Sequence, residues 1–319
     1  MSSQLMVPAS VTLPAIVTAA GDQASLRFVE FFAGTIRNVH TRRAYSRAVG
    51  AFLVWCEENG IRTITAVQPL HVAAWIELQT RELAAPTAKL RLAAIRHLFD
   101  SLVIGQIVPF NPAASVRGPA HSVRTGKTLV LDPAEARLLL DTIDASTPIG
   151  LRDRALIALM IYSFSRIGAA LSMRGEDVFT QNRRLWVRLR EKSGKRHEMP
   201  CHHTLETYLH AYLEGAGIAD DAKGPLFRTI GRGTGKLTRT ALPQANAYAM
   251  VRRRAMAAAI GTKIGNHSFR AMGITAYLKN GGTLENAAAM ANHASTRTTQ
   301  LYDRRRDDIS LDEVERIRV

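Results

Sequence analysis

A segment rich in proline, glycine, serine and alanine, residues 109–128, interrupts an otherwise helix-like chain and constrains its fold more than any other feature. Such a composition favours an extended linker over a helix or a strand. The 319 residues are enough for two domains at ~100–200 residues each. We therefore predict a helical domain over residues 24–108, a second domain over residues 129–319, and a flexible leader over residues 1–23.

Before this linker, apolar residues recur at the spacing of one helix face, which predicts a bundle of helices. Three helix starts are marked in the sequence. Thr41 is a candidate N-cap, Pro69 suits the first turn of the next helix, and Thr87 precedes a third apolar series.

After the linker, helical patterns give way to alternation and then resume. Asp132-Pro133 marks one helix start, and the apolar stretch from Leu151 to Met160 predicts a buried helix. Apolar and polar residues then alternate over residues 185–190, and a turn signal at 193–194 precedes a returning strand over 197–200. The sequence thus predicts a mainly α fold with a small antiparallel β-sheet in the second domain.

The net charge of +15 and the pI near 10.5 suggest a polyanionic partner, most often nucleic acid, although a merely basic protein has the same composition. Residues 1–120 carry a net charge of +4 and residues 121–319 a net charge of +11, so the second half is the stronger candidate for phosphate contact. A basic helix face can equally be a solvated surface. The candidates for DNA contact are Arg42, Arg43, Lys89, Arg91, Arg96, Lys195 and Arg196.

Cysteine usage and hydropathy indicate the cellular setting. Cys56 and Cys201 lie in separate halves, which fits a reducing compartment without a disulfide framework. Because no run of ~18 apolar residues exists, we expect no membrane span and predict a cytoplasmic protein. The glycine-rich loop at 231–236 lacks P-loop spacing, and the histidines near Cys201 lack a second metal-ligand pair. We therefore predict no cofactor and no metal.

Six residues of the second domain carry the chemical signature of the chain. They are two arginines, two histidines, one lysine and one tyrosine: Arg166, Lys192, His267, Arg270, His293 and Tyr302. The cationic groups suit a phosphodiester, on which negative charge develops in the transition state. A tyrosine hydroxyl beside them is a candidate nucleophile.

The two arginines have different settings in the sequence. Arg270 lies three residues after His267, so both share one helix face, and Asn266 is a candidate cap for that helix. Arg166 follows an apolar stretch, where an unpaired charge is costly. It either holds two phosphate oxygens or pairs with a carboxylate such as Asp153 or Asp177.

Tyr302 lies nine residues after His293. A continuous helix would separate the two by ~13 Å, at ~1.5 Å per residue, so they can share one phosphate only if the chain turns between them. Ser295 and Thr296 are good helix caps and can supply this break. The alternative is that Tyr302 is an ordinary surface or packing residue.

With these elements the chain resembles the tyrosine recombinase (phage integrase) family over roughly residues 25–319. In the first domain the resemblance rests on Thr41-Arg-Arg-Ala-Tyr45 and Phe52-Leu-Val-Trp-Cys56. In the second domain it rests on Arg152-Asp-Arg-Ala-Leu and on the six residues above. It implies a two-domain clamp around DNA, made of a helical core-binding domain and a catalytic domain.

The resemblance also implies a role for each of the six residues. Tyr302 would attack the scissile phosphate and form a 3′-phosphotyrosine, while Arg166 and Arg270 would hold its non-bridging oxygens. His267 and His293 would assist with charge and protons. Lys192 would protonate the leaving 5′-oxygen, and Lys195 is the alternative for that role.

The chain departs from the family pattern at three places near the site. Ala169 stands where an acidic residue usually follows the first arginine by three positions. Asn292 stands where glycine usually precedes the second histidine. Ser163-Phe164-Ser165 replaces the usual Thr-Gly-type turn before Arg166. These departures change what surrounds Arg166 and leave the six groups in place.

The resemblance implies double-stranded DNA as substrate and a homo-oligomer, a dimer on one site and a tetramer on paired sites. It leaves integration, excision and resolution open. Two alternatives remain: a type IB topoisomerase-like enzyme that acts alone, and a DNA-binding protein that has lost catalysis. The capping box Ser310-Leu-Asp-Glu313 predicts a short helix in the tail 310–319, which docks on its own domain or on a neighbouring protomer.

Overall fold

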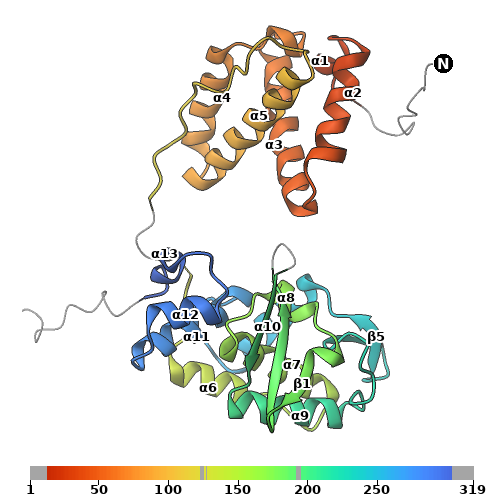
Figure 1. The fold of residues 1–319 in the computed structure, drawn as a ribbon, viewed down its shortest axis with the longest axis vertical. Helices are drawn as coiled ribbons and strands as arrows, with labels where there is room; N and C mark the ends of the chain where they lie inside the picture. The colour runs from red at the N-terminus through yellow and green to blue at the C-terminus, as the bar shows by residue number, and fades with distance from the viewer. Residues whose placement is uncertain (1–12, 123–125, 127, 192–194, 304–319) are drawn as a thin grey trace, which may run out of the picture. The chain divides into compact units, whose positions relative to one another are not determined.

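The computed structural model describes residues 13–122, 126, 128–191 and 195–303. The chain folds into two compact units, residues 1–122 (unit 1) and residues 123–319 (unit 2), so the boundary falls inside the segment predicted as a linker. Unit 1 is helical, and unit 2 consists of helices with two small antiparallel sheets (Figure 1). The predicted mainly α fold with a small antiparallel sheet is confirmed.

Unit 1 consists of five α-helices and two short helical turns among its described residues. In chain order these are α1 (Ala15–Thr18), α2 (Asp22–Glu30), η1 (Phe31–Thr35), α3 (Val39–Glu58), η2 (Ile64–Ala66), α4 (Pro69–Glu82) and α5 (Ala85–Ile104). Aromatic and aliphatic side chains from all of the longer helices form one core, with Phe52 and Trp75 in edge-to-face contact at 5.1 Å. The predicted helix bundle is confirmed.

Two of the three predicted helix starts are displaced. Helix α3 begins at Val39, because the Asn38 side chain accepts hydrogen bonds from the backbone N–H groups of His40 and Thr41 at 2.9 and 3.1 Å. Thr41 therefore lies inside the first turn and is not the cap. Helix α5 begins at Ala85 with proline in its first turn, ahead of Thr87. The start of α4 at Pro69 is confirmed.

Part of the predicted leader and part of the predicted linker are packed into unit 1. Ile16 and Val17 of α1 are buried, and the Ile16 N–H donates to Glu57 at 3.1 Å, so the described residues of the leader are folded. Ala113 and Val116 of the linker segment are also buried in this core. Apolar side chains explain both differences, because burial removes them from water. Residues 1–12 lie outside the described part.

Unit 2 carries eight α-helices and five strands among its described residues. Its elements are α6 (Pro133–Asp141), α7 (Pro148–Tyr162), α8 (Ile167–Leu171), η3 (Gly175–Asp177), β1 (Val178–Gln181), β2 (Arg184–Arg190), β3 (Arg196–Pro200), α9 (His203–Gly215), β4 (Arg228–Ile230), β5 (Leu237–Ala241), α10 (Gln244–Ala257), α11 (Asn266–Lys279), α12 (Leu284–Met290) and α13 (Thr296–Gln300).

Helix α7 is the centre of this unit. It is apolar almost all round, packs against α9 and α11, and buries nearly every side chain from Leu151 to Ile161. This confirms the predicted buried helix. Helix α6 starts as predicted, with Asp132 as cap and Glu135 reaching back to the Asp132 N–H at 3.1 Å.

The predicted hairpin is formed by β2 and β3, with Val187 paired to Met199. Leu185, Val187 and Leu189 are buried while the residues between them are more exposed, as their alternation predicts. The sequence did not reveal β1, which pairs with the other edge of β2, nor the separate β4–β5 pair. The predicted turn at 193–194 lies outside the described residues.

Candidate active site

Arg166 stands at the N-cap position of the five-residue helix α8, directly after the turn that ends α7. Its Nη1 donates to Glu191 Oε2 at 2.6 Å. Glu191 directly follows β2, and its side chain is 4% exposed, whereas that of Arg166 is 39% exposed. The arginine therefore keeps an accessible guanidinium while one of its nitrogens is held by a buried carboxylate.

The carboxylates predicted as alternative partners of Arg166 are used elsewhere. Asp153 accepts hydrogen bonds from Arg152 and Arg254, with the shortest contacts at 2.6 and 2.8 Å. Asp177 lies near two arginines of the sheet instead, at 3.7 and 3.9 Å. Both pairings proposed for Arg166 were wrong, because tertiary packing brings a third carboxylate, Glu191, closer.

Two of the departures from the family pattern occur where the backbone is left-handed. Phe164 has φ of 52° and Asn292 has φ of 47°. Glycine adopts this region freely, asparagine tolerates it, and a bulky residue such as phenylalanine rarely occupies it. Phe164 is nevertheless held there, because its carbonyl accepts a hydrogen bond from Arg270 and its ring packs against Gly273 of α11.

Arg270 is buried on α11, with only 1% of its surface exposed. Its Nη1 donates to the Phe164 carbonyl, and its Nη2 donates to the Ala291 carbonyl at 2.6 Å. These bonds join the turn before Arg166 to the segment before His293. Burial, with Arg166 nearby, lowers the pKa of Arg270 to about 10, so it remains charged at neutral pH.

The tautomer of His293 follows from its two hydrogen bonds. Nε2 lies 2.7 Å from Arg270 Nη2, and arginine can only donate, so this nitrogen accepts. Nδ1 then carries the proton and donates to Thr299 Oγ1 at 2.8 Å. The ring is neutral, and burial together with the charges of Arg270 and Arg166 lowers its pKa to about 4.

The Tyr302 hydroxyl lies 2.8 Å from His267 Nε2, and its ring stacks on His293 with the centroids 5.9 Å apart. The break predicted between His293 and Tyr302 is confirmed, because Ser295 caps α13 by accepting from the Arg297 N–H at 3.2 Å. A separate hydrogen bond from Thr275 to the Tyr302 carbonyl, 3.0 Å long, fixes the backbone. The hydroxyl therefore points into the cationic cluster.

His267 and Arg270 share one face of α11, as their spacing predicts. The cap is one residue earlier than expected: Gly265 is the N-cap, its N–H donates to Ser268 at 3.2 Å, and Asn266 is already helical. Desolvation of the His267 ring by the surrounding protein lowers its pKa, and the charges of Arg270 and Arg166 lower it further. A neutral His267 can accept the Tyr302 proton.

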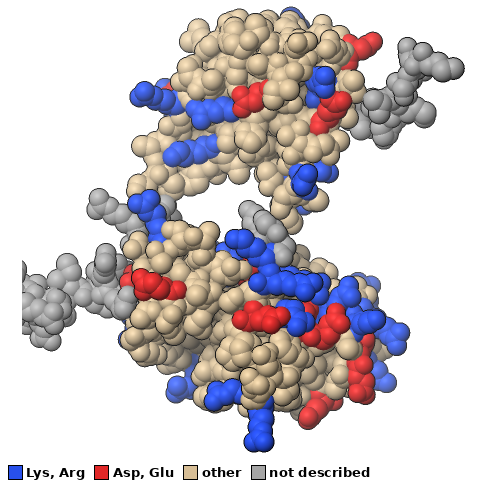
Figure 2. Space-filling model, viewed as in Figure 1, with Lys and Arg blue, Asp and Glu red and all other residues tan. Residues whose placement is uncertain are grey.

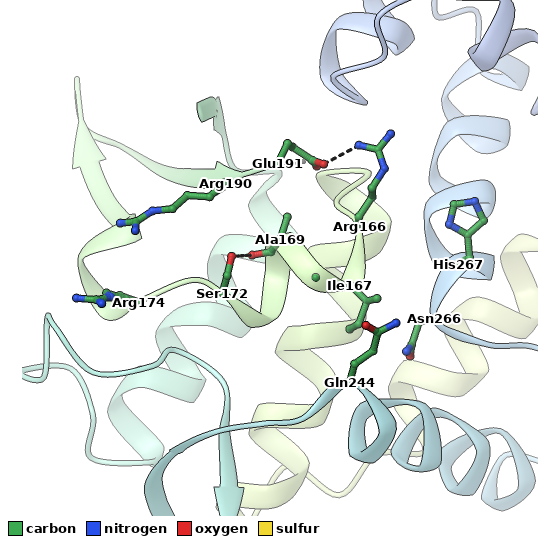
Figure 3. Close-up of a pocket in the computed structure, with 11 residues that line it drawn as sticks. Arg166, Ile167, Ala169, Ser172, Arg174, Arg190, Glu191, Gln244, Asn266 and His267 are labelled. Atoms are coloured by element: carbon green, nitrogen blue, oxygen red, sulfur yellow. Dashed lines mark hydrogen bonds and ion pairs between the residues drawn. The ribbon is translucent and has the colours of Figure 1, made fainter. Parts of the chain in front are cut away.

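A cavity of about 760 Å³ opens beside this cluster. Arg166 and Glu191 face each other at its edge, and His267 projects from the neighbouring helix α11 (Figure 3). Five of the six predicted residues fall in the described part of the chain. Of these, His267, Arg270, His293 and Tyr302 are joined by hydrogen bonds or ring contacts, and Arg166 lines the same cavity as His267. Lys192 lies outside the described residues.

Two residues of the site escaped the sequence analysis. Glu191 precedes Lys192 and holds Arg166, and Thr299 is fully buried and fixes the tautomer of His293. A carboxylate between the basic residues near the tip of the hairpin was the available signal for Glu191. No local signal marked Thr299, because its role depends on a contact made only when α13 folds back on His293.

Several of the other basic candidates have partners within their own unit. Arg42 donates to the Ile36 carbonyl at 2.8 and 3.1 Å. Arg96 donates to the carbonyls of Ala113 and Val116, and Arg91 donates to the Gln79 side chain. The side chains with the most exposed settings are those of Arg43, Lys89, Lys195 and Arg196.

No described helix is long and apolar enough to cross a membrane. The described residues also contain no group of three or more His, Cys, Asp or Glu side chains that could hold a metal ion. Both cysteines in the described part are free thiols. Burial raises the pKa of each to about 12, and neither thiol lies at the site.

Both units match models of known protein families. The family model described as "Phage integrase family" matches residues 130–308, and "Phage integrase, N-terminal SAM-like domain" matches residues 28–104. The tyrosine recombinase XerD of Mycobacterium leprae is 31% identical over 284 residues, covering 82% of this chain and 86% of that protein. The tyrosine recombinase XerC of Xylella fastidiosa strain M23 is 26% identical over 264 residues, covering 82% and 85%.

Solved structures share the fold at lower identity. XerH recombinase, bound to its difH substrate in a post-cleavage complex, aligns with a TM-score of 0.69 at 15% identity, covering 95% of this chain and 96% of that one. A lambda integrase dimer bound to a core site aligns with a TM-score of 0.66 at 16% identity, covering 91% and 98%. Because the first family model alone matches more than half of the residues, the chain belongs to the tyrosine recombinase (phage integrase) family.

Proposed function

We propose that this protein is a site-specific DNA recombinase that cleaves and rejoins DNA through a 3′-phosphotyrosine intermediate. One observation carries the proposal: the Tyr302 hydroxyl lies 2.8 Å from His267 Nε2, within hydrogen-bond distance, inside a cluster that contains two arginines. A nucleophile, a proton acceptor and cationic groups for a phosphate are thus present together.

The first step breaks one phosphorus–oxygen bond and forms another. Tyr302 Oη attacks the scissile phosphorus, and its proton passes to His267 Nε2. Arg166 and Arg270 stabilise the negative charge that develops on the non-bridging oxygens. His293 stays neutral and orients Arg270 through the 2.7 Å hydrogen bond.

The leaving 5′-oxygen takes a proton from Lys192, with Lys195 as the alternative donor. A 5′-hydroxyl from a second strand then reverses the reaction, so the phosphodiester is restored without an external energy source. This cycle needs no metal, because the cationic side chains supply the charge.

Several basic side chains support contact with duplex DNA. Figure 2 shows lysine and arginine gathered on the visible face of unit 2 over the three-stranded sheet and the β4–β5 hairpin, with acidic side chains among them. We propose phosphate contacts by Lys195 and Arg196 in unit 2 and by the unit 1 candidates Arg42, Arg43, Lys89, Arg91 and Arg96. The two units would then clamp the duplex from two sides.

We further propose that the enzyme acts as a dimer on one site and a tetramer on two paired sites, with the tail 310–319 joining protomers. The tail lies outside the described residues, so this rests on its sequence and on the family. Two features favour the cytoplasm as the place of action. The proposed substrate is DNA, and both cysteines are free thiols.

A nicked suicide substrate tests the reaction. After cleavage, the short 5′-hydroxyl fragment diffuses away, and the covalent protein–DNA complex accumulates on a denaturing gel. Absence of this complex with cognate DNA would exclude the proposed chemistry and favour a binding protein. Strand exchange between two duplexes separates a recombinase from a topoisomerase-like enzyme.

Salt dependence tests the phosphate contacts. Each neutralised phosphate should contribute a slope of about −0.9 to log K against log salt concentration. The full chain should therefore show a steeper slope than residues 129–319 alone. Equal slopes and equal affinities would contradict the two-unit clamp.

A further inference from the structure

The cavity beside the active site contains one acidic side chain among its described lining residues. That side chain is Glu191, and the others are basic, neutral polar or apolar. Negative charge near a phosphate-binding site weakens phosphate binding unless it is neutralised. A buried carboxylate at this place therefore requires a specific reason.

Glu191 is fixed by the backbone more firmly than its partner is. Its N–H donates to the Lys195 carbonyl at 2.8 Å, which closes the base of the β2–β3 turn. Its side chain is only 4% exposed, so the carboxylate is shielded from solvent. Arg166, by contrast, has a side chain that is 39% exposed and stands at the N-cap of a helix of only five residues. The carboxylate is thus the rigid member of the pair.

The geometry leaves the arginine free to bind a phosphate. Glu191 Oε2 contacts only one nitrogen, Nη1, at 2.6 Å. A guanidinium has five N–H donors in a rigid plane, so fixing one nitrogen restricts the orientation of the others. Charge-assisted hydrogen bonds of this length are strong and directional.

Helix α8 offers no alternative partner. Ala169, one turn after Arg166, lines the same cavity, but its side chain carries no acceptor. The Ser172 hydroxyl donates to the Ala169 carbonyl at 2.9 Å (Figure 3). An arginine at this place would have to be oriented from another element. Only the hairpin brings a carboxylate within reach among the described lining residues.

We propose that Glu191 is a positioning residue that orients Arg166 toward the scissile phosphate, in place of the carboxylate absent at Ala169. This inference rests on the proposed function. Because Lys192 follows Glu191 directly in sequence, the same hairpin would supply both the orientation of the arginine and the general acid.

The test uses the full-length protein and a nicked suicide substrate in single-turnover experiments. Glu191→Gln keeps the size of the side chain and removes its charge. We expect it to slow covalent complex formation by about 10-fold or more, the range seen when an orienting partner of an active-site ligand is lost. DNA affinity should stay unchanged or rise. A rate equal to or above that of the wild type overturns the proposal.

Glu198→Gln is the matched control. Glu198 lies on β3 of the same hairpin and pairs with Arg188 at 2.6 Å, but it does not line the cavity. It makes the same chemical change without touching Arg166. Its cleavage rate should match that of the wild type, and a loss as large as that of Glu191→Gln would show a general hairpin defect and overturn the proposal.

A double-mutant cycle separates orientation from hairpin damage. Glu191→Gln in an Arg166→Ala background should cause no further loss, because the group that it orients is gone. A damaged hairpin would instead lower the rate by the same factor in both backgrounds, which would overturn the proposal. If wild-type protein forms no covalent complex, the proposed function itself fails, and that result is distinct from the failure of this inference.

Discussion

Arginines join chain segments in both units, but over different distances in sequence. In unit 1, Arg42 binds the Ile36 carbonyl six residues away, and Arg96 binds carbonyls 17 and 20 residues away. In unit 2, Arg166 reaches Glu191 across 25 residues, and Arg270 reaches the Phe164 carbonyl across 106. The first set joins segments that are at most 20 residues apart, whereas the second set brings together the separate elements of the candidate site.

This difference separates arginines that join segments within unit 1 from arginines that bring together the elements of the candidate site. A guanidinium whose donors are directed at backbone carbonyls stabilises the fold, whether or not it also contacts a phosphate. Arg166 keeps accessible donors, and Arg270 lies beside a histidine that contacts the tyrosine. The following predictions test this contrast, from the largest expected effect to the smallest.

Tyr302→Phe should abolish covalent complex formation, because the attacking oxygen is removed, while DNA affinity stays near that of the wild type. A gel-shift assay and the suicide substrate measure the two properties. The hydroxyl contacts His267 of its own chain. Mixing Tyr302→Phe with Arg270→Ala protein should therefore restore no cleavage, and restored cleavage would show that the tyrosine acts on a neighbouring protomer's site.

Arg166→Ala and Arg270→Ala should each slow cleavage by about 10²–10³, the loss expected when one preorganised donor is removed. Arg270→Ala should also lower the melting temperature, because the Phe164 and Ala291 carbonyls lose their partner. Arg270→Lys keeps the charge but not the planar fork, so it should remain impaired. Full activity in Arg270→Lys would mean that charge alone suffices.

Arg96→Ala should destabilise unit 1 by about 1–3 kcal/mol, because two carbonyls lose their donor. The rate of cleavage at saturating protein should change little. Lys89→Ala on the same exposed side of α5 is the control and should change stability by less than about 0.5 kcal/mol. Urea unfolding followed by circular dichroism measures both. Equal stability losses would remove the distinction between a fold-stabilising arginine and a surface lysine.

Stability should fall as pH is lowered from about 6.5 to about 4. His293 stays neutral until its folded pKa of about 4, whereas in the unfolded chain it takes up a proton below the ordinary 6.5. The unfolded state therefore binds more protons in this window and is favoured there. His293→Gln can still accept from Arg270 and donate to Thr299, so its midpoint should depend less on pH. An identical pH slope in that variant would contradict this assignment.

Asn292→Gly should have the smallest effect. The φ of 47° suits glycine at least as well as asparagine, so the free energy of unfolding should change by less than about 1 kcal/mol. Asn292→Val should cost more, because a β-branched residue is strained in this region. Urea midpoints compare the two, and equal values would argue against a left-handed backbone before His293.

Much of the fold was predictable because its signals are local. The helical period of unit 1, the buried helix α7 and the β2–β3 alternation all follow from side chains a few residues apart. Helix starts were less certain, since Thr41 and Asn38 compete as caps and only the structure shows which side chain accepts the amides. Packing of the leader and of Ala113 was missed, because short apolar stretches do not reveal their partners.

The sequence alone determined the chemical groups that the candidate site offers: two arginines, two histidines, a lysine and a tyrosine, in a family-like order. Only the tertiary structure decided how they meet. It pairs Arg166 with Glu191 in place of Asp153 or Asp177, gives His293 its neutral tautomer through Thr299, and brings the Tyr302 hydroxyl to His267. These choices depend on contacts between residues far apart along the chain, whose distances are set by the packing of whole helices and strands.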